Sequence, residues 1–135
     1  MDPQQLSDRY LSALRGADAT AMLSLFTANA LVHSPLYGPL PAAEFYQILF
    51  SDTGAARPVL RGITQGTTPD GTRLASIWFR FEWELPTGRA VTFDVVDMLE
   101  LADDDRIAAL HIVYDTADVR PAFEEATGKA IWQPD

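Results

Sequence analysis

One stretch of the chain, Arg89–Leu101, sets an acidic side chain among apolar ones. Strand side chains on one face recur at every second residue. Asp97 therefore shares its face with a set of apolar side chains: Val91, Phe93, Val95, Leu99 and Leu101. A carboxyl group in such surroundings must find a partner, take up a proton or line a wet cavity. The pattern thus leaves two interpretations open for Asp97, a structural hydrogen-bonding group or part of a functional site.

Two histidines are the other side chains that could move a proton near neutral pH. His33 precedes Ser34, and strand alternation points the two side chains to opposite faces unless Pro35 distorts the strand end. His111 should face away from any pocket that Tyr114 lines, because the two positions differ by an odd number. Neither histidine has companion carboxylates at ligand spacing, so we expect no metal site.

The composition is that of an ordinary globular chain and excludes several classes of function. Of 135 residues, 47% are hydrophobic and 21% charged, enough to build a real core. The absence of cysteine excludes disulfides, thiolate zinc sites and a cysteine nucleophile. The net charge of −9 argues against nucleic acid or an anionic membrane as a partner. There is no apolar run of membrane-spanning length and no signal-like N-terminal segment, so we expect a cytoplasmic protein.

The elements that must position these residues follow from periodicity and turn signals. Helical spacing predicts helices over residues 4–15, 18–26, 42–50 and 119–126. Strands are predicted over residues 30–34, 59–67, 74–85, 89–101 and 106–115, with a proline-rich loop over 34–41. Helices followed by four antiparallel strands indicate one α+β domain over residues 1–135, with a pocket between sheet and helices.

Several short motifs, each on its expected element, resemble those of one superfamily. They are Arg9-Tyr10, His33-Ser-Pro35, Phe45-Tyr46, Phe79-Arg-Phe-Glu82, Phe93-Asp-Val-Val-Asp97 and Arg106-Ile107. Their order over nearly the whole chain resembles the nuclear transport factor 2-like superfamily, in particular ketosteroid isomerase and the SnoaL-like polyketide cyclases. The resemblance implies a cone-shaped, cystatin-like domain whose curved, mainly antiparallel sheet wraps around N-terminal helices and encloses a pocket. The superfamily hosts many functions, so the fold transfers better than the activity.

The resemblance also implies roles for individual residues. Tyr10 matches the oxyanion-hole tyrosine of the isomerase, and Asp97 matches its aspartic acid, a known example of a carboxyl group kept neutral by an apolar site. Ser34 stands where the isomerase has its general-base aspartate, and a serine cannot serve as that base unless another group activates it. His33 is the candidate replacement base. Tyr46 resembles a second tyrosine behind the oxyanion hole, and the expected pocket walls include Phe79, Phe93, Val95 and Tyr114.

Two functions are compatible with these residues. In the first, the protein is an isomerase or cyclase in which Tyr10 and neutral Asp97 donate hydrogen bonds to a developing enolate oxygen of a hydrophobic substrate. An ionised Asp97 could alternatively be the base of a cyclase reaction. In the second, the protein is a non-catalytic ligand-binding domain or dimeric scaffold, as the substitution at Ser34 favours. Arg80 lies on the face opposite Phe79, which disfavours the Asp-Arg-Asp arrangement of limonene epoxide hydrolase, another relative.

The expected partners are a hydrophobic small molecule and a second copy of the chain, with no cofactor. The face of the sheet opposite the pocket carries apolar and aromatic side chains that a monomer would expose: Trp78, Val96, Met98, His111 and Val113. We therefore predict a homodimer formed through this outer face.

Overall fold

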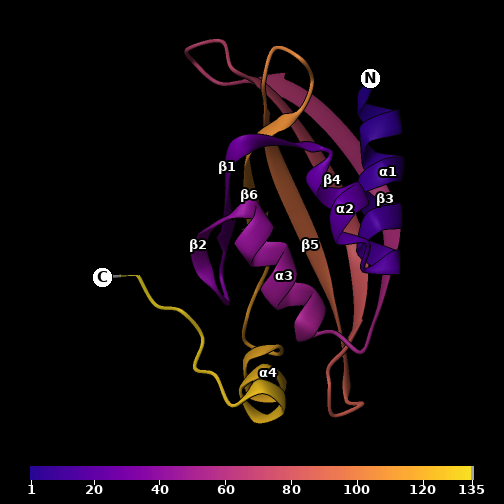
Figure 1. Cartoon of the computed structure of the whole chain (residues 1–135), viewed down its shortest axis with the longest axis vertical. Helices are drawn as coiled ribbons and strands as arrows, with labels where there is room; N and C mark the ends of the chain where they lie inside the picture. The colour runs from indigo at the N-terminus through magenta and orange to yellow at the C-terminus, as the bar shows by residue number, and fades with distance from the viewer. Residues whose placement is uncertain (135) are drawn as a thin grey trace.

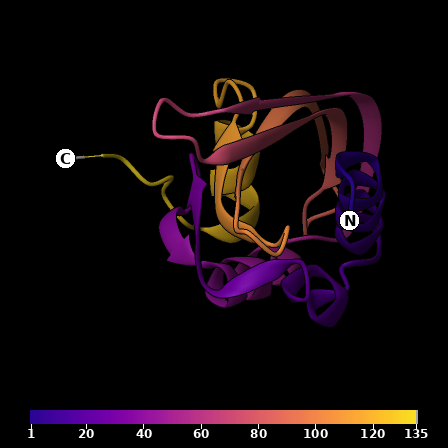
Figure 2. The same ribbon diagram turned by 90° about the horizontal axis from the view of Figure 1, so that it is seen from above.

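The protein is an α+β structure in which a curved six-stranded sheet wraps around helices on its concave side (Figures 1 and 2). The computed structural model describes residues 1–134. The helices are α1 (Pro3–Gly16), α2 (Ala19–Leu23), α3 (Ala42–Ser51) and α4 (Arg120–Thr127). The strands are β1 (Phe26–Ser34), β2 (Gly38–Pro41), β3 (Ala55–Thr67), β4 (Arg73–Glu84), β5 (Ala90–Leu101) and β6 (Ile107–Val113), in the spatial order β2-β1-β6-β5-β4-β3. The predicted fold class is confirmed.

Helix α1 forms where its capping signals predict it. The Asp2 carboxylate accepts a hydrogen bond from Gln5 N at 2.8 Å, and the Gln5 side chain accepts one from Asp2 N at 3.1 Å, a reciprocal capping box. Pro3 occupies the first helical turn, where its missing N–H costs nothing. The inward stripe of α1 places Tyr10 and Leu14 against the sheet. This helix therefore brings a tyrosine hydroxyl into the interior.

The region between α1 and α3 differs from the prediction. The second helix, expected over residues 18–26, ends at Leu23, and Phe26 already belongs to β1. Phe26 pairs with Ile107 of β6 in parallel register, and Ile107 N donates to Leu25 O at 2.8 Å. Local spacing cannot reveal a partner some eighty residues away. The competing strand pairing therefore shortens the helix.

The proline-rich segment after β1 is a tight turn followed by a short strand. Gly38 has φ +78°, and an added Cβ would lie 2.6 Å from the Trp132 ring, so only glycine fits here. Ser34 pairs with Gly38 and His33 with Pro39, which makes β2 an antiparallel edge strand. An edge strand tolerates the missing N–H groups of its prolines. The prediction of a turn-rich, non-helical segment is confirmed, but it missed this strand.

The four later strands form the predicted antiparallel meander. Strand β3 begins at Ala55, earlier than the expected Val59, and Pro58 is accommodated because β3 is the other edge of the sheet. On β5, Asp97 lies between Ile77 of β4 and Ile112 of β6. It therefore sits in the interior of the sheet, where solvent cannot reach it from an edge. Among the described residues, no helix is long and apolar enough to cross a membrane.

Candidate active site

Asp97 is buried on the concave face of the sheet with only one of its two oxygens satisfied. Its side chain is 1% exposed, as the alternation of β5 predicts. The Tyr10 hydroxyl donates to Asp97 Oδ2 at 2.6 Å. Asp97 Oδ1 is also buried and has no hydrogen-bond partner in the described part of the chain. A buried polar atom without a partner is costly, and in the described residues this oxygen shares that condition only with Ser7 Oγ.

A chain of hydroxyl groups leads from helix α3 to Asp97. Tyr46 is fully buried, and its hydroxyl lies 3.1 Å from the Tyr10 hydroxyl. When Tyr46 donates to Tyr10 and Tyr10 donates to Asp97, the Tyr10 proton is already engaged. Direct donation from Tyr10 to a ligand would therefore require this chain to reverse. In the observed geometry Tyr10 orients Asp97, and Tyr46 orients Tyr10.

Burial raises the pKa of the Asp97 carboxyl to about 7, although the hydrogen bond from Tyr10 acts in the opposite direction. Burial, reinforced by the nearby Asp97, raises the pKa of Tyr10 well above its ordinary value. Asp97 thus exchanges between neutral and ionised forms near neutral pH, whereas Tyr10 keeps its proton. No lysine, arginine or histidine is among the residues lining the cavity to hold the carboxylate ionised.

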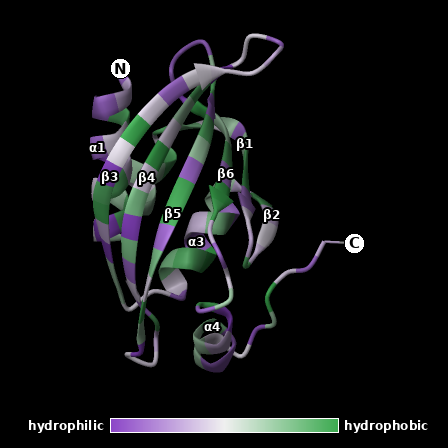
Figure 3. Cartoon of the chain, turned by 180° about the vertical axis from the view of Figure 1, so that it is seen from behind, coloured by the Kyte–Doolittle hydropathy of each residue, from purple (hydrophilic) through white to green (hydrophobic). Residues whose placement is uncertain are grey.

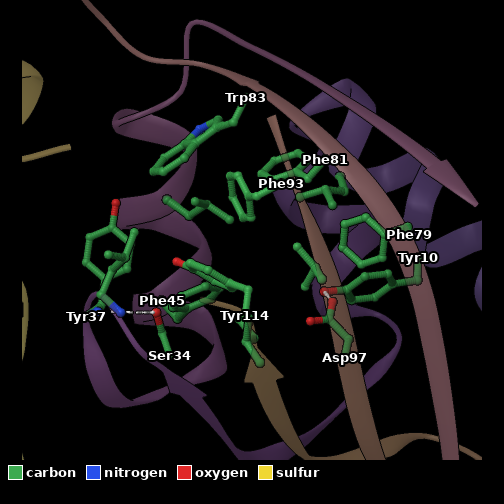
Figure 4. A pocket seen from close by; sticks show the side chains of 15 residues that line it. Tyr10, Ser34, Tyr37, Phe45, Phe79, Phe81, Trp83, Phe93, Asp97 and Tyr114 are labelled. Atoms are coloured by element: carbon green, nitrogen blue, oxygen red, sulfur yellow. Dashed lines mark hydrogen bonds between the residues drawn. The ribbon is translucent and has the colours of Figure 1, made fainter. Parts of the chain in front are cut away.

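Asp97 and Tyr10 lie in the wall of a cavity of ≈ 50 Å³ between the sheet and the helices. A single water needs roughly 10–15 Å³, so the cavity has room for a small ligand. Figure 4 shows the aromatic side chains around this space, with the Asp97 carboxyl group at one side. The other lining residues are Leu14, Ser34, Leu36, Tyr37, Phe45, Leu49, Phe79, Phe81, Trp83, Phe93, Val95, Ile112 and Tyr114.

Ser34 lines the cavity but is occupied in holding its own turn. Its Oγ accepts hydrogen bonds from Leu36 N at 3.1 Å and Tyr37 N at 3.2 Å. The serine oxygen therefore closes the turn that places Tyr37 in the cavity wall. Its remaining hydrogen-bonding capacity is its proton, which makes Ser34 a donor and leaves it poorly suited to act as a base.

The structure separates His33 from the other predicted catalytic residues. His33 lies on the opposite face of the sheet, where its ring stacks on His111 with centroids 4.7 Å apart and planes 4° from parallel. His111 Nε2 is 2.6 Å from Glu100 Oε2 on the same face. Neither histidine lines the cavity. Burial alternates regularly over residues 30–34 of β1, and this alternation removes the geometric basis for His33 as a replacement base.

The predicted ligand-binding residues come together with one exception. Ser34, Phe79, Phe93, Val95 and Tyr114 all line the cavity. Tyr46 does not reach it and stands behind Tyr10, as the resemblance implied.

Other lining residues were missed, and some left a signal in the sequence. Phe81 and Trp83 share strand parity with Phe79, so they could have been named. Tyr37 could not, because it lies in a turn without periodicity.

A polar cluster beside the cavity was also missed. The Tyr37 hydroxyl donates to Asp52 Oδ2 at 2.7 Å, and Lys129 Nζ donates to the same oxygen at 2.8 Å. Asp52 is 8% exposed, so it is a largely buried anchor for both donors. These three residues come from a turn, the end of α3 and the segment after α4. No local pattern connects segments so far apart in sequence.

An aromatic-lined cavity between a curved sheet and its helices, with a buried tyrosine–aspartate pair, defines a pocket domain of the nuclear transport factor 2-like type. The profile of the SnoaL-like domain family matches residues 8–110, and the chain belongs to this family. None of the curated proteins matches the sequence at a significant level.

Solved structures share the fold at low sequence identity. A candidate polyketide cyclase from Pseudomonas putida KT2440 has a TM-score of 0.63 and 16% identity, over 88% of this chain and 96% of that one. The epoxide hydrolase/cyclase-like enzyme SalBIII, which has a role in pyran ring formation in the polyether salinomycin, has a TM-score of 0.66 and 16% identity. The match covers 86% of this chain and 92% of that one. A ketosteroid isomerase-like protein from Catenulispora acidiphila DSM 44928, in complex with trimethylamine, has a TM-score of 0.71 and 12% identity, over 98% and 100%. At such identities the likeness shows the fold alone.

Proposed function

We propose that this chain binds a small hydrophobic carbonyl compound, whose oxygen accepts a hydrogen bond from neutral Asp97. The observation that carries the proposal is Asp97 Oδ1, a buried oxygen in the wall of an aromatic cavity that has no hydrogen-bond partner among the residues that the structure describes. A protonated carboxyl group presents a strong donor there, and a ligand carbonyl would satisfy it. The apolar walls would hold the rest of the ligand by excluding water.

The hydroxyl chain gives this donor a fixed direction. Tyr10 binds Oδ2 of Asp97, so rotation of the carboxyl group would break a 2.6 Å hydrogen bond. A donor that is already oriented stabilises developing negative charge on an enol or enolate oxygen without further reorganisation. The cavity is thus suited to polarise a carbonyl group.

Binding without turnover is the function that the residues support best. Deprotonation next to a carbonyl needs a base as well as an oxyanion donor. Ser34 is engaged by two backbone N–H groups, and His33 lies on the far side of the sheet. Asp97 is the only cavity-lining side chain that ionises near neutral pH, so it cannot serve as neutral donor and base at the same moment.

Turnover is nevertheless the second candidate function, in which ionised Asp97 is the base of a cyclase-type or isomerase-type reaction. Its pKa of about 7 is well matched to proton transfer at neutral pH. The structural neighbours that are described as a candidate polyketide cyclase and an epoxide hydrolase/cyclase-like enzyme favour this candidate. In this reaction Tyr10 would stabilise the carboxylate form.

Titration calorimetry with a ketone series from butanone to acetophenone tests the binding proposal. The Asp97→Ala variant should bind about tenfold more weakly, because a hydrogen bond from a buried donor is lost. Asp97→Asn should stay within about threefold of the parent, since an amide still donates. Asp94→Asn changes an exposed carboxylate on the opposite face of β5 and is the matched control. Equal affinity of the parent and the Asp97→Ala variant would refute the proposal.

Deuterium exchange separates binding from turnover. If ionised Asp97 is a base, the methyl hydrogens of acetophenone should exchange in D₂O faster with the parent than with Asp97→Asn. A parent that binds the ketone without catalysing exchange supports the binding function and excludes this base.

A further inference from the structure

The cavity has a second chemical capacity besides carbonyl binding. It combines a buried carboxyl group with many aromatic rings and contains no cationic side chain. The aromatic lining residues are Tyr10, Tyr37, Phe45, Phe79, Phe81, Trp83, Phe93 and Tyr114. Ring faces attract cations, and cages of such rings recognise alkylated ammonium groups. From this combination we infer that the cavity binds a small tertiary alkylammonium ion, whose N–H⁺ donates to Asp97 Oδ1.

The geometry of Asp97 suits a cationic donor. Oδ2 is held by Tyr10, whereas Oδ1 has no partner among residues 1–134 and lies in the wall of the same cavity. In the ionised form Oδ1 is a pure acceptor with lone pairs and no donor to satisfy them. An N–H⁺ group would supply both the missing hydrogen bond and the missing counter-charge, a combination stronger than a neutral hydrogen bond.

No group around Asp97 competes with such a cation. The titratable side chains that face it are Tyr10 from α1, Tyr46 from α3 and Tyr114 from β6, and burial raises the pKa of each. Its neighbours across the sheet are Ile77 of β4 and Ile112 of β6, which carry no charge. The ligand would therefore be the only cation beside the carboxylate.

The rings also lie close enough to one another to form a continuous wall. The centroids of Phe93 and Tyr114 are 4.7 Å apart, those of Phe81 and Phe93 are 5.6 Å apart, and those of Phe79 and Phe81 are 6.0 Å apart. N-Methyl groups could pack against these rings while the N–H⁺ bond points to Asp97, as the arrangement in Figure 4 allows. The cavity of ≈ 50 Å³ favours a small ligand.

The two ligand classes require opposite protonation states of one group. A ketone needs neutral Asp97, and an ammonium ion needs the carboxylate. This inference uses the same cavity as the proposed function but does not depend on carbonyl binding, so either can fail alone.

Calorimetry with trimethylammonium chloride tests the inference, with tert-butanol as a neutral probe of similar shape and tetramethylammonium as a cation without N–H. Trimethylammonium should bind more tightly than both. Its affinity should be roughly tenfold lower at about pH 6 than at about pH 8, because only ionised Asp97 binds it. Acetophenone should show the opposite pH trend, provided that the proposed function is correct.

The Asp97→Asn variant then separates the two proposals. It should lose trimethylammonium binding and keep ketone binding, while Asp94→Asn should change neither. Circular dichroism verifies that each variant is folded, and the pH dependence of the parent provides the test even if Asp97→Asn fails to fold. Three results would each overturn the inference: no binding at millimolar trimethylammonium, equal affinity for tert-butanol, or an affinity independent of pH.

Discussion

At the scale of single residues, the central feature is a carboxyl group that the fold buries without a cation. Its folded pKa of about 7 is raised above the unfolded value of 3.8, so the native state binds the proton more tightly than the unfolded chain does. The Asp97 contribution to folding is therefore most favourable below the unfolded pKa. It is lost progressively between about pH 4 and pH 7 and then levels off.

The Asp97→Asn variant should abolish this dependence. Relative to the parent, its free energy of unfolding should increase by up to about 4 kcal/mol between about pH 4 and about pH 8, because a shift of one pKa unit corresponds to about 1.4 kcal/mol. Urea unfolding of both proteins across this range measures the difference. A constant difference would mean that the Asp97 carboxyl group is solvated in the folded protein.

The alternation of apolar and polar residues predicted that Asp97 is buried. It could do so because one face of β5 is buried and the other is not, so the sequence shows which side chains point inward. The same reasoning correctly pointed His33 and Ser34 to opposite faces. It could not show that Asp97 Oδ1 lacks a partner, or that Ser34 accepts two backbone hydrogen bonds. Those facts depend on distances between elements that are remote in sequence.

At the scale of elements, the turn after β1 decides whether a base can face the cavity. An aspartate at position 34 could accept the N–H groups of Leu36 and Tyr37 through one oxygen and present the other to the cavity, since such turns suit aspartate as well as serine. Asp97 would remain the oxyanion donor opposite it.

We therefore predict that Ser34→Asp raises enolisation of a ketone at least tenfold above the parent, because general-base catalysis contributes about a hundredfold or more when geometry is good. Deuterium exchange into acetophenone measures the rate, and Ser34→Asn, which forms the same turn without a base, is the control. Equal rates for these two variants would show that position 34 is not oriented toward the reacting carbon.

The antiparallel meander β3–β6 could be predicted because each hairpin is local and each strand alternates. The β1–β6 pairing could not be predicted in this way. Parallel strands are not joined by a short hairpin turn, so no local sequence signal marks them as partners. The early end of α2 results from that pairing, and the extra strand β2 results from the turn that brings Gly38–Pro41 back along β1. Tertiary contacts thus changed the elements at one edge of the sheet and left the element that carries Asp97 as predicted.

At the scale of the whole molecule, the convex face of the sheet remains uncovered in the single chain (Figure 3). Trp78 is 47% exposed and Val113 is 59% exposed on this face. Exposed apolar area of this kind is typical of an interface. The homodimer remains a prediction of the sequence that this exposure supports.

The Trp78→Glu variant should convert such a dimer to a monomer at micromolar concentration, since a charge at a closed symmetric interface meets its own copy. Light scattering measures the mass of the parent and of the variant. Gln65→Glu, an exposed change on β3, is the control. A parent with the mass of one chain would contradict the predicted dimer.

Lys129 is the only lysine of the chain, and its Nζ donates a hydrogen bond to Asp52 Oδ2 beside the cavity. Through Asp52, which also accepts a hydrogen bond from Tyr37, Lys129 holds the segment after α4 in place. In the same segment, Trp132 N donates to Leu36 O at 2.8 Å. These contacts lie beside one wall of the cavity, whereas Asp97 lies in another part of it. Lys129→Met should therefore raise ligand association and dissociation rates severalfold together and leave the equilibrium constant nearly unchanged, as stopped-flow fluorescence can measure. A change in affinity without matched rate changes would place Lys129 in the binding site. Matched changes of both rates would mean that the C-terminal segment controls how long a ligand stays bound.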